Sequence, residues 1–451
     1  MATVVTRFAP SPTGKAHAGG YRTAMYAWLF ARQQKGEFIL RIEDTDRARN
    51  NEEAKEDIFE ALKWLGLEHD RLYIQSANLA RHKEILTQLI REDRAYVSHE
   101  PAKDDASVMK DVIRFRNPNK IITFTDLIRG PITIDTTDLG DFVIARAIDD
   151  PVYHLAVIVD DHDEGVTHVI RAEEHIANTP RHILLHEALG WQIPHYAHLP
   201  LVLSEDKKKL SKRKGALAMT DYAKLGYLSD AVFNCIAMLG WNPADPGSDQ
   251  ELFSIPELIE RFDFNRMQKS GAIFKQEKLD WFNREYIKRL SGEQFWEHAE
   301  PYLKDTIAGV QERSLLEKLE PLLRERMVKF SDMQHFFAAK DGSTEGEFDY
   351  FLMRPKIDTS KLAWKGTSLQ EALQHLEKVA GLLEGLTDWS EEGVKGAVMP
   401  YAEETGKGNV LWPFRVALSG REKSPDPFTI AAILGRGETL ARITDAAAPI
   451  K

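Results

Sequence analysis

His17, Gly19 and Gly20 stand at the start of an expected helix, directly after a turn rich in proline and glycine. Before the turn, the β-branched segment 3–6 predicts a short strand, and from Ala24 onward apolar residues recur at helical spacing. A strand, a tight turn and a helix direct backbone N–H groups at one point, which favours binding of a phosphate. Glycine lets a nucleotide approach the backbone, and an imidazole can donate to a phosphoryl oxygen. An ordinary turn with a surface histidine would show the same pattern.

A second stretch concentrates positive charge. Segment 204–215 carries six basic residues within the eight positions from Lys207 to Lys214. Alone, such a run fits a solvated loop or a contact with an anionic surface equally well. Together with the first stretch, which lies almost two hundred residues earlier, it indicates a site for a phosphorylated ligand.

Charged residues also follow several apolar segments. Glu43 comes directly after the expected strand 38–42, and Arg171 lies where the expected strand 167–175 turns charged. The carboxyl ends of parallel strands form the edge at which α/β sheets bind ligands, so Glu43 and Arg171 are candidate ligand contacts. Thr45 or Asp46 could instead cap the following helix. The acidic and histidine cluster within 154–163 could suggest a metal, but we favour a polar strand end or a helix cap.

Length and composition limit the possible classes. A chain of 451 residues holds two or three domains, and 43% hydrophobic with 29% charged residues is typical of a soluble globular protein. The single cysteine, Cys235, excludes an internal disulfide and a cysteine zinc cluster and fits a reducing cytoplasm. We see no signal peptide and no membrane span. The net charge of −11 argues against a nucleic-acid binder that ignores sequence.

The pattern of elements predicts an α/β half and a helical half. Residues 1–95 alternate strands and helices, 96–150 read as a small insertion with antiparallel strands, and 151–245 return to the α/β pattern. From about 246 onward the pattern is almost wholly helical. We expect Thr179 to cap a helix that has Pro180 in its first turn. We also expect Pro301 and Pro321 to kink or split two helices, and breaks at 341–343 and near Pro400.

Taken together, the motifs resemble bacterial-type glutamyl-tRNA synthetases, a family of class I aminoacyl-tRNA synthetases. His17-Ala18-Gly19-Gly20 is similar to the HIGH element of that class, and Lys209-Leu210-Ser211-Lys212-Arg213 to its KMSKS loop. The resemblance runs nearly end to end. The matching segments are 7–14 with His17 and Gly19, 41–46, 159–162, 169–175, 209–213 and 411–420.

The resemblance implies a fold and a domain order. It implies a Rossmann-like α/β catalytic domain with a small α+β insertion, followed by an all-α C-terminal anticodon-binding region. The catalytic domain would occupy 1–95 and 151–245, split by a shortened acceptor-stem insertion at 96–150. A helical stem-contact region at 246–325 and an anticodon-binding domain at 326–451 would follow.

The resemblance also implies an activity and its residues. The enzyme would use ATP with Mg²⁺ to form glutamyl-adenylate and then transfer L-glutamate to tRNA(Glu). It would be a cytoplasmic monomer. Structural zinc is not expected, because Ser98 and His99 lie near where some relatives carry zinc-binding cysteines. His17 and Lys212 would be catalytic. The implied glutamate contacts are Arg7, Ala9, Ser11, Glu43, Tyr153 and Arg171; the ATP contacts are Thr13, Gly14, His17, Gly19, Glu174, His175, Lys209 and Lys212; and the tRNA contacts are Asp44, Arg47, Arg326 and Arg415.

Other functions stay open at this point. The enzyme could also charge tRNA(Gln), or the chain could be an inactive tRNA-binding homologue. A truncated relative that modifies a tRNA base would lack the helical half, and glutaminyl-tRNA synthetases end in β-barrels, whereas 290–451 are poor in strand patterns. A simple nucleotidyltransferase would share the first motif without needing the helical half.

Overall fold

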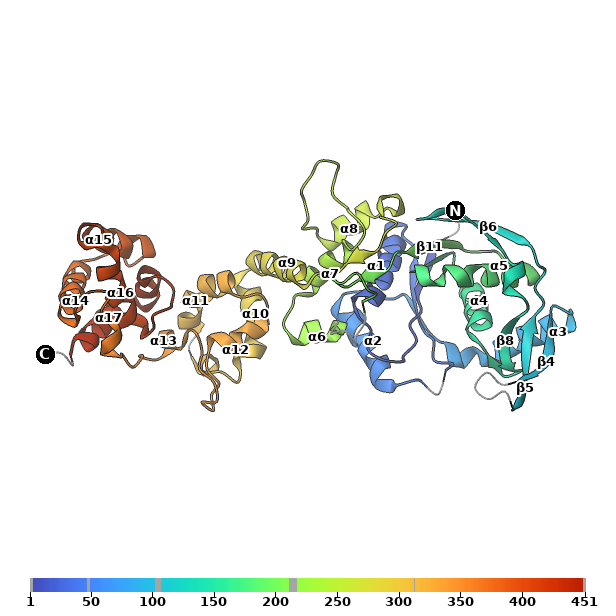
Figure 1. Cartoon of the computed structure of the whole chain (residues 1–451), viewed down its shortest axis with the longest axis horizontal. Coiled ribbons are helices and arrows are strands. Elements are labelled where there is room, and N and C mark those ends of the chain that lie inside the picture. Colours follow the sequence, from blue (N-terminus) through green and yellow to red (C-terminus); the bar gives the residue numbers. More distant parts are fainter. Residues whose placement is uncertain (1–2, 47–48, 102–106, 211–216, 312, 449–451) are drawn as a thin grey trace. The chain divides into compact units, whose positions relative to one another are not determined.

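The computed structural model describes residues 3–46, 49–101, 107–210, 217–311 and 313–448. The chain separates into two compact units, Met1–Tyr286 and Ile287–Lys451. The first unit holds all three sheets of the described residues, and the second is helical (Figure 1). The predicted order of an α/β half and a helical half is therefore confirmed.

A seven-stranded sheet forms the centre of the first unit. Its strand order is β3-β2-β1-β10-β11-β6-β7, and all neighbours are parallel except the antiparallel pair β6 and β7. The chain thus proceeds outward from β1 in one direction and returns to its other side at β10. Ligands bind at such a switch point, outside the carboxyl ends of the strands. The strands are β1 Val5–Phe8, β2 Glu37–Ile42, β3 Arg71–Ile74, β6 Ile121–Asp126, β7 Gly130–Asp135, β10 His168–Ala172 and β11 His195–Leu199.

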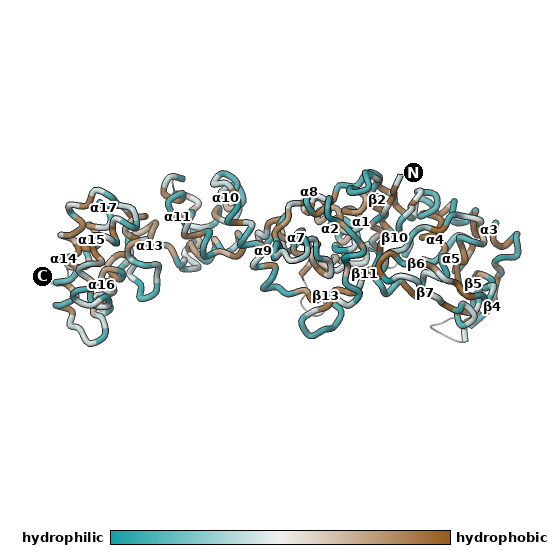
Figure 2. Tube along the Cα trace, turned by 90° about the horizontal axis from the view of Figure 1, so that it is seen from above, coloured by the Kyte–Doolittle hydropathy of each residue, from teal (hydrophilic) through white to brown (hydrophobic). Residues whose placement is uncertain are grey.

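Helices cover this sheet and close its core. Helix α1 packs against β1, β2 and β10 and also against α7 and α8, which follow much later in the chain (Figure 1). Buried strands and helices carry the apolar stretches, shown brown in Figure 2, because their branched and aromatic side chains fill the space between the layers. The helices of this unit are α1 Ala18–Gln33, α2 Glu52–Trp64, α3 Leu79–Arg91, α4 Tyr153–Asp163, α5 Thr179–Ala188, α6 Met219–Lys224, α7 Ser229–Ala237 and α8 Ile255–Arg261, and α9 Gln276–Arg289 spans the division between the units.

The antiparallel strands expected between 96 and 150 are divided between two sheets. Strands β4 Ala95–Pro101, β5 Met109–Phe115, β8 Phe142–Ala147 and β9 Asp150–Pro151 form a separate antiparallel sheet. The hairpin of β6 and β7 instead extends the large sheet, because β6 pairs with β11. A parallel pair, β12 Val202–Leu203 with β13 Ala272–Ile273, completes the sheets.

Three local predictions were wrong. Thr179 does not cap α5: the N-cap is Asn178, and the Thr179 hydroxyl binds buried groups instead. Neither Thr45 nor Asp46 caps α2, whose N-cap is Asn51. The acidic cluster within 154–163 is not a strand end, since it lies on helix α4.

The second unit is built from the helices α10 to α17. Pro301 and Pro321 lie inside the continuous helices α10 and α11 and split neither. Pro400 lies inside α15, and the break that was expected near it occurs at Gly406, whose φ is 106°. The break at 341–343 is confirmed. The helices are α10 Gly292–Leu303, α11 Arg313–Arg326, α12 Met333–Phe336, α13 Asp349–Leu352, α14 Leu369–Glu384, α15 Glu391–Thr405, α16 Lys407–Ser419 and α17 Pro427–Ala447.

Candidate active site

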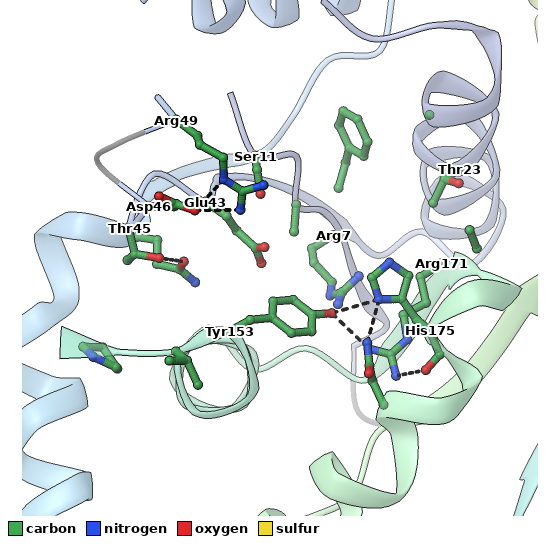
Figure 3. A pocket seen from close by; sticks show the side chains of 18 of the residues that line it. Arg7, Ser11, Thr23, Glu43, Thr45, Asp46, Arg49, Tyr153, Arg171 and His175 are labelled. Atoms are coloured by element: carbon green, nitrogen blue, oxygen red, sulfur yellow. Dashed lines mark hydrogen bonds and ion pairs between the residues drawn. The ribbon is translucent and has the colours of Figure 1, made fainter. Parts of the chain in front are cut away.

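A pocket of about 630 Å³ opens at the carboxyl ends of β1, β2 and β10. Figure 3 shows the guanidinium groups of Arg7 and Arg171 and the ring of His175 around the hydroxyl of Tyr153, with Glu43 and Ser11 farther along the pocket. Its volume suits a small molecule. All six residues predicted to contact glutamate line it, together with the predicted ATP contact His175. The further lining residues are Phe8, Gly20, Thr23, Thr45, Asp46, Arg49, Gln75, Arg146, Pro151, Val152, Ile170, Ala172 and Asn178.

The first helix begins beside this pocket. His17 is the N-cap of α1, and its Nδ1 accepts a hydrogen bond of 3.1 Å from the N–H of Gly19. A Cβ added at Gly19 would lie 3.0 Å from Cε1 of His17, so glycine leaves room for the imidazole against the helix. The turn before it contains Gly14 with φ 150° and exposes Thr13. This is the strand, turn and helix expected of a phosphate site.

One wall of the pocket contains Arg7 and Glu43, which belong to a buried network of carboxylates and two arginines. Arg7 Nε lies 3.1 Å from Asp161 Oδ1, and Arg41 Nη2 lies 2.8 Å from the same oxygen. Arg41 also contacts Glu43 at 3.3 Å and Glu164 at 2.7 Å. The side chain of Arg41 is fully buried; its two Nη atoms contact these three carboxylates, and its Nε has no hydrogen-bond partner among the described residues. Sequence reasoning missed Arg41 and Glu164, although an arginine inside the apolar strand 38–42 was an available signal.

Burial and charge oppose each other at these carboxylates. Burial raises the pKa of Asp161, but the charges of Arg7 and Arg41 outweigh it and lower the pKa to about 2. For Glu43, burial outweighs Arg41 and Arg7, and the pKa is raised. Burial likewise raises the pKa of Glu164 to about 7 against the attraction of Arg41. Asp161 is therefore the carboxylate that holds its charge most firmly.

A second wall of the pocket surrounds Arg171 with neutral acceptors. Its Nη2 donates to Thr179 Oγ1 at 2.8 Å, its Nε to His198 Nε2 at 3.2 Å, and its Nη1 lies 3.2 Å from His182 Nδ1. A longer contact of 3.5 Å joins Nη1 to the Tyr153 hydroxyl. Within the described residues no carboxylate pairs with Arg171, which is only 5% exposed. Its positive charge is thus not balanced by a direct ionic partner.

The histidines of this wall are held neutral. Burial, followed by the charge of Arg171, lowers the pKa of His175 to about 4 and that of His182 well below its usual range. Burial, followed by Arg181 and Arg171, lowers the pKa of His154 to about 4. Neutral imidazoles can accept hydrogen bonds from Arg171, whereas imidazolium groups would repel it.

Other predicted site residues lie apart from the pocket or outside the described residues. Glu174 pairs with Lys209 at 2.5 Å, both about half exposed, which links the end of β10 to the basic stretch. Lys212 and Arg47 lie outside the described residues.

Three predicted tRNA contacts have intramolecular partners or partial burial. Both carboxylate oxygens of Asp44 bind Ser76, which anchors the loop after β2. Arg326 pairs with Glu347 at 3.3 Å and stays 42% exposed. Arg415 lies on α16, with its Nε buried and unpaired.

The described residues offer neither a metal-binding cluster nor a membrane-crossing helix. No group of three or more histidine, cysteine or acidic side chains is arranged to hold a metal ion there. None of the described helices has the length and apolarity that a membrane crossing requires.

This sheet, its switch-point pocket and the helical second unit define the class I aminoacyl-tRNA synthetase architecture, and the family models agree. Residues 3–104 and 98–281 match the catalytic domain of class I tRNA synthetases (E and Q), and 294–447 match an anticodon-binding domain. The glutamate–tRNA ligase of Desulforamulus reducens is 35% identical and covers 98% of this chain and 99% of its own, and that of Syntrophus aciditrophicus is 37% identical with 99% and 97% covered. The chain belongs to the glutamate–tRNA ligase family.

A solved structure supports this assignment. The glutamate–tRNA ligase of Elizabethkingia meningosepticum, crystallised in complex with its amino acid, superposes with a TM-score of 0.84 at 32% identity over the full length of both chains. The predicted family, fold class and enzyme class are therefore confirmed. Families of this class use ATP and Mg²⁺ in general.

Proposed function

We propose that this protein attaches L-glutamate to tRNA(Glu) in two steps, through the pocket at the carboxyl ends of β1, β2 and β10. The observation that carries the proposal is that Arg171 is buried and pairs with no carboxylate of the described residues, in a pocket that also contains Arg7 and Glu43. A buried cation without an ionic partner favours an anionic ligand, and a guanidinium can bind a carboxylate through two hydrogen bonds.

The charges along the pocket give glutamate an orientation. Arg7 is already paired with Asp161, so Arg171 takes the side-chain carboxylate and Glu43 the ammonium group. The α-carboxylate must stay available to attack ATP, which makes the side-chain carboxylate the one that is held deepest. Tyr153 supplies a hydroxyl between Arg171 and His175, and Ala9 and Ser11 complete the lining.

ATP binds next to the start of α1 in this proposal. His17 and Gly19 contact its phosphates together with Thr13 and Gly14, and Glu174, His175, Lys209 and Lys212 complete the set. The α-carboxylate of glutamate attacks the α-phosphorus, pyrophosphate leaves, and the terminal adenosine of the tRNA then attacks the adenylate. No protein nucleophile is needed, because positioning and charge stabilisation supply the rate. Mg²⁺ bound to the ATP phosphates would neutralise part of their charge, and we assign it no protein ligand.

The remaining assignments extend the same proposal. Asp44, Arg47, Arg326 and Arg415 contact tRNA, with 96–150 at the acceptor end, 246–325 at the stem and 326–451 at the anticodon. The protein acts as a cytoplasmic monomer without structural zinc.

ATP–pyrophosphate exchange tests the function directly. The exchange is measured with glutamate or glutamine, each with and without tRNA(Glu). We expect exchange with glutamate plus tRNA. Exchange with glutamine instead would contradict the assigned side-chain pocket, and no exchange from folded protein would favour an inactive tRNA-binding homologue. Charging of tRNA(Gln) with glutamate, assayed separately, distinguishes a non-discriminating enzyme.

A further inference from the structure

The turn between β6 and β7 is tied to the pocket through one buried pair, Asp126 and His198. Oδ2 of Asp126 accepts from Nδ1 of His198 at 2.7 Å and from the backbone N–H of His198 at 3.0 Å. Oδ1 accepts from the backbone N–H groups of Ile128 and Arg129 at 3.0 and 2.9 Å. Asp126 is 1% exposed and His198 is fully buried. One carboxylate thus holds both the turn and the imidazole.

This pairing fixes the tautomer of His198. Because the carboxylate of Asp126 can only accept, Nδ1 of His198 carries the proton and Nε2 presents its lone pair. That lone pair accepts from Nε of Arg171 at 3.2 Å, and Oγ1 of Thr179 lies 3.1 Å from the same nitrogen. Arg171 and His198 are also register partners on the neighbouring strands β10 and β11. The other tautomer would direct an N–H at the N–H of Arg171.

Ionisation supports the same assignment. Burial raises the pKa of Asp126, but the hydrogen bond from His198 and the backbone N–H groups outweigh it and lower the pKa. Burial lowers the pKa of His198 despite the attraction of Asp126. An ionised Asp126 and a neutral His198 are the states that the acceptor role at Arg171 requires.

We propose that Asp126 and His198 are positioning residues for glutamate: Asp126 sets the tautomer of His198, and His198 orients the guanidinium of Arg171 toward the substrate carboxylate. The inference rests on the proposed function and deepens it. Asp126, at the β6–β7 turn and 45 positions before Arg171 in the sequence, would thus contribute to the amino-acid specificity of the pocket.

A double-mutant cycle separates this role from a purely structural one. Asp126→Asn offers an N–H to His198 and favours the wrong tautomer, so we expect the KM for glutamate to rise about 10- to 100-fold, while the KM for ATP changes little. In His198→Gln, the amide oxygen can accept from Arg171 without help from a carboxylate. Asp126→Asn should therefore raise the KM for glutamate far less in the His198→Gln background.

Further variants keep the proposal testable if Asp126→Asn does not fold. His198→Leu removes the acceptor and should raise the KM for glutamate, whereas His198→Gln should restore most of it. His82→Gln is the matched control, since His82 is also buried and lies 2.7 Å from an aspartate, Asp160, but does not contact Arg171. We expect it to leave the KM for glutamate unchanged.

The outcomes distinguish the two proposals. Equal effects of Asp126→Asn in both backgrounds, or equal KM values for His198→Leu and the wild type, would overturn the positioning role while leaving the proposed function intact. A wild-type protein without glutamate-dependent exchange would overturn both. A tautomer-dependent rise in KM that disappears in the His198→Gln background would support the inference.

Discussion

The two arginine walls of the pocket differ in what balances their charge. On one wall, Arg7 and Arg41 share Asp161, and Arg41 also binds Glu43 and Glu164. On the other wall, Arg171 is surrounded by hydroxyl, imidazole and carbonyl acceptors. Both walls are buried, so the difference does not come from exposure.

The difference separates a stabilising role from a binding role. A buried arginine that is paired with carboxylates contributes to folding, and removing it leaves several buried charges unpaired. A buried arginine among neutral acceptors keeps its charge for a ligand. Arg41, which is not among the residues lining the pocket, should therefore respond to mutation mainly in stability, and Arg171 mainly in glutamate binding.

The largest effect is expected at Arg171. Arg171→Met removes the charge that faces the substrate carboxylate, and loss of one partner of a buried charge pair costs about 2–5 kcal/mol, or roughly 30- to several-thousand-fold in affinity. The glutamate-dependent exchange rate measures this loss. Arg171→Lys keeps the charge without the planar fork and should recover only part of it. An exchange rate close to that of the wild type would contradict the binding role.

Arg41 should show the reverse pattern. Arg41→Met leaves Asp161, Glu43 and Glu164 buried without their common partner, which should lower the free energy of unfolding by about 3–5 kcal/mol. Urea denaturation of Arg41→Met and Arg171→Met compares the two walls. If Arg171→Met destabilises the fold as much as Arg41→Met, the contrast between the walls is wrong.

A smaller effect is expected in the pH dependence of stability. Because burial raises the pKa of Glu164 from 4.5 to about 7, the folded state binds this proton more tightly than the unfolded chain. The group stabilises the fold fully below its unfolded pKa and loses this contribution as the pH rises through about 7. Glu164→Gln should remove roughly 1–3 kcal/mol of this pH-dependent loss.

Unfolding curves collected between pH 5 and 8 measure this effect as the slope of the free energy of unfolding against pH. Asp161 does not interfere, since its pKa is lowered to about 2 and its contribution is lost only on acidification below its ordinary value of 3.8. The buried histidines contribute equally to both proteins, so the same slope in Glu164→Gln and the wild type would show that Glu164 does not titrate in this range.

The smallest effect on stability is expected at the exposed pair of Lys209 and Glu174. Exposed ion pairs contribute about 0–1 kcal/mol, so Lys209→Ala should leave the unfolding free energy nearly unchanged. If Lys209 binds ATP, the KM for ATP should nevertheless rise while that for glutamate does not. A raised KM for glutamate alone would place Lys209 in the wrong subsite.

Residues close to a sequence motif were predictable because the local pattern determined their environment. His17 and Gly19 follow a strand and a proline-rich turn and lie at the start of α1, where the pattern placed them. Glu43 follows β2 and Arg171 lies near the end of β10, and the parallel sheet brings these strand ends together.

The supporting residues were less accessible to sequence reasoning. Asp126 and His198 meet because β6 pairs with β11, and no local sequence pattern predicts a pairing of strands that are far apart in the chain. The prolines within α10 and α11 split neither helix, because local preference alone does not decide whether a helix continues.

The preference for glutamate over glutamine tests the central claim most directly. The ratio of kcat/KM for the two amino acids is measured by tRNA-supported ATP–pyrophosphate exchange in the wild type and in Arg171→Met. If Arg171 holds the side-chain carboxylate, the wild type strongly prefers glutamate, and the variant loses most of that preference. If the variant loses activity with both amino acids but keeps the wild-type ratio, Arg171 does not read the side chain, and the account of the pocket is contradicted.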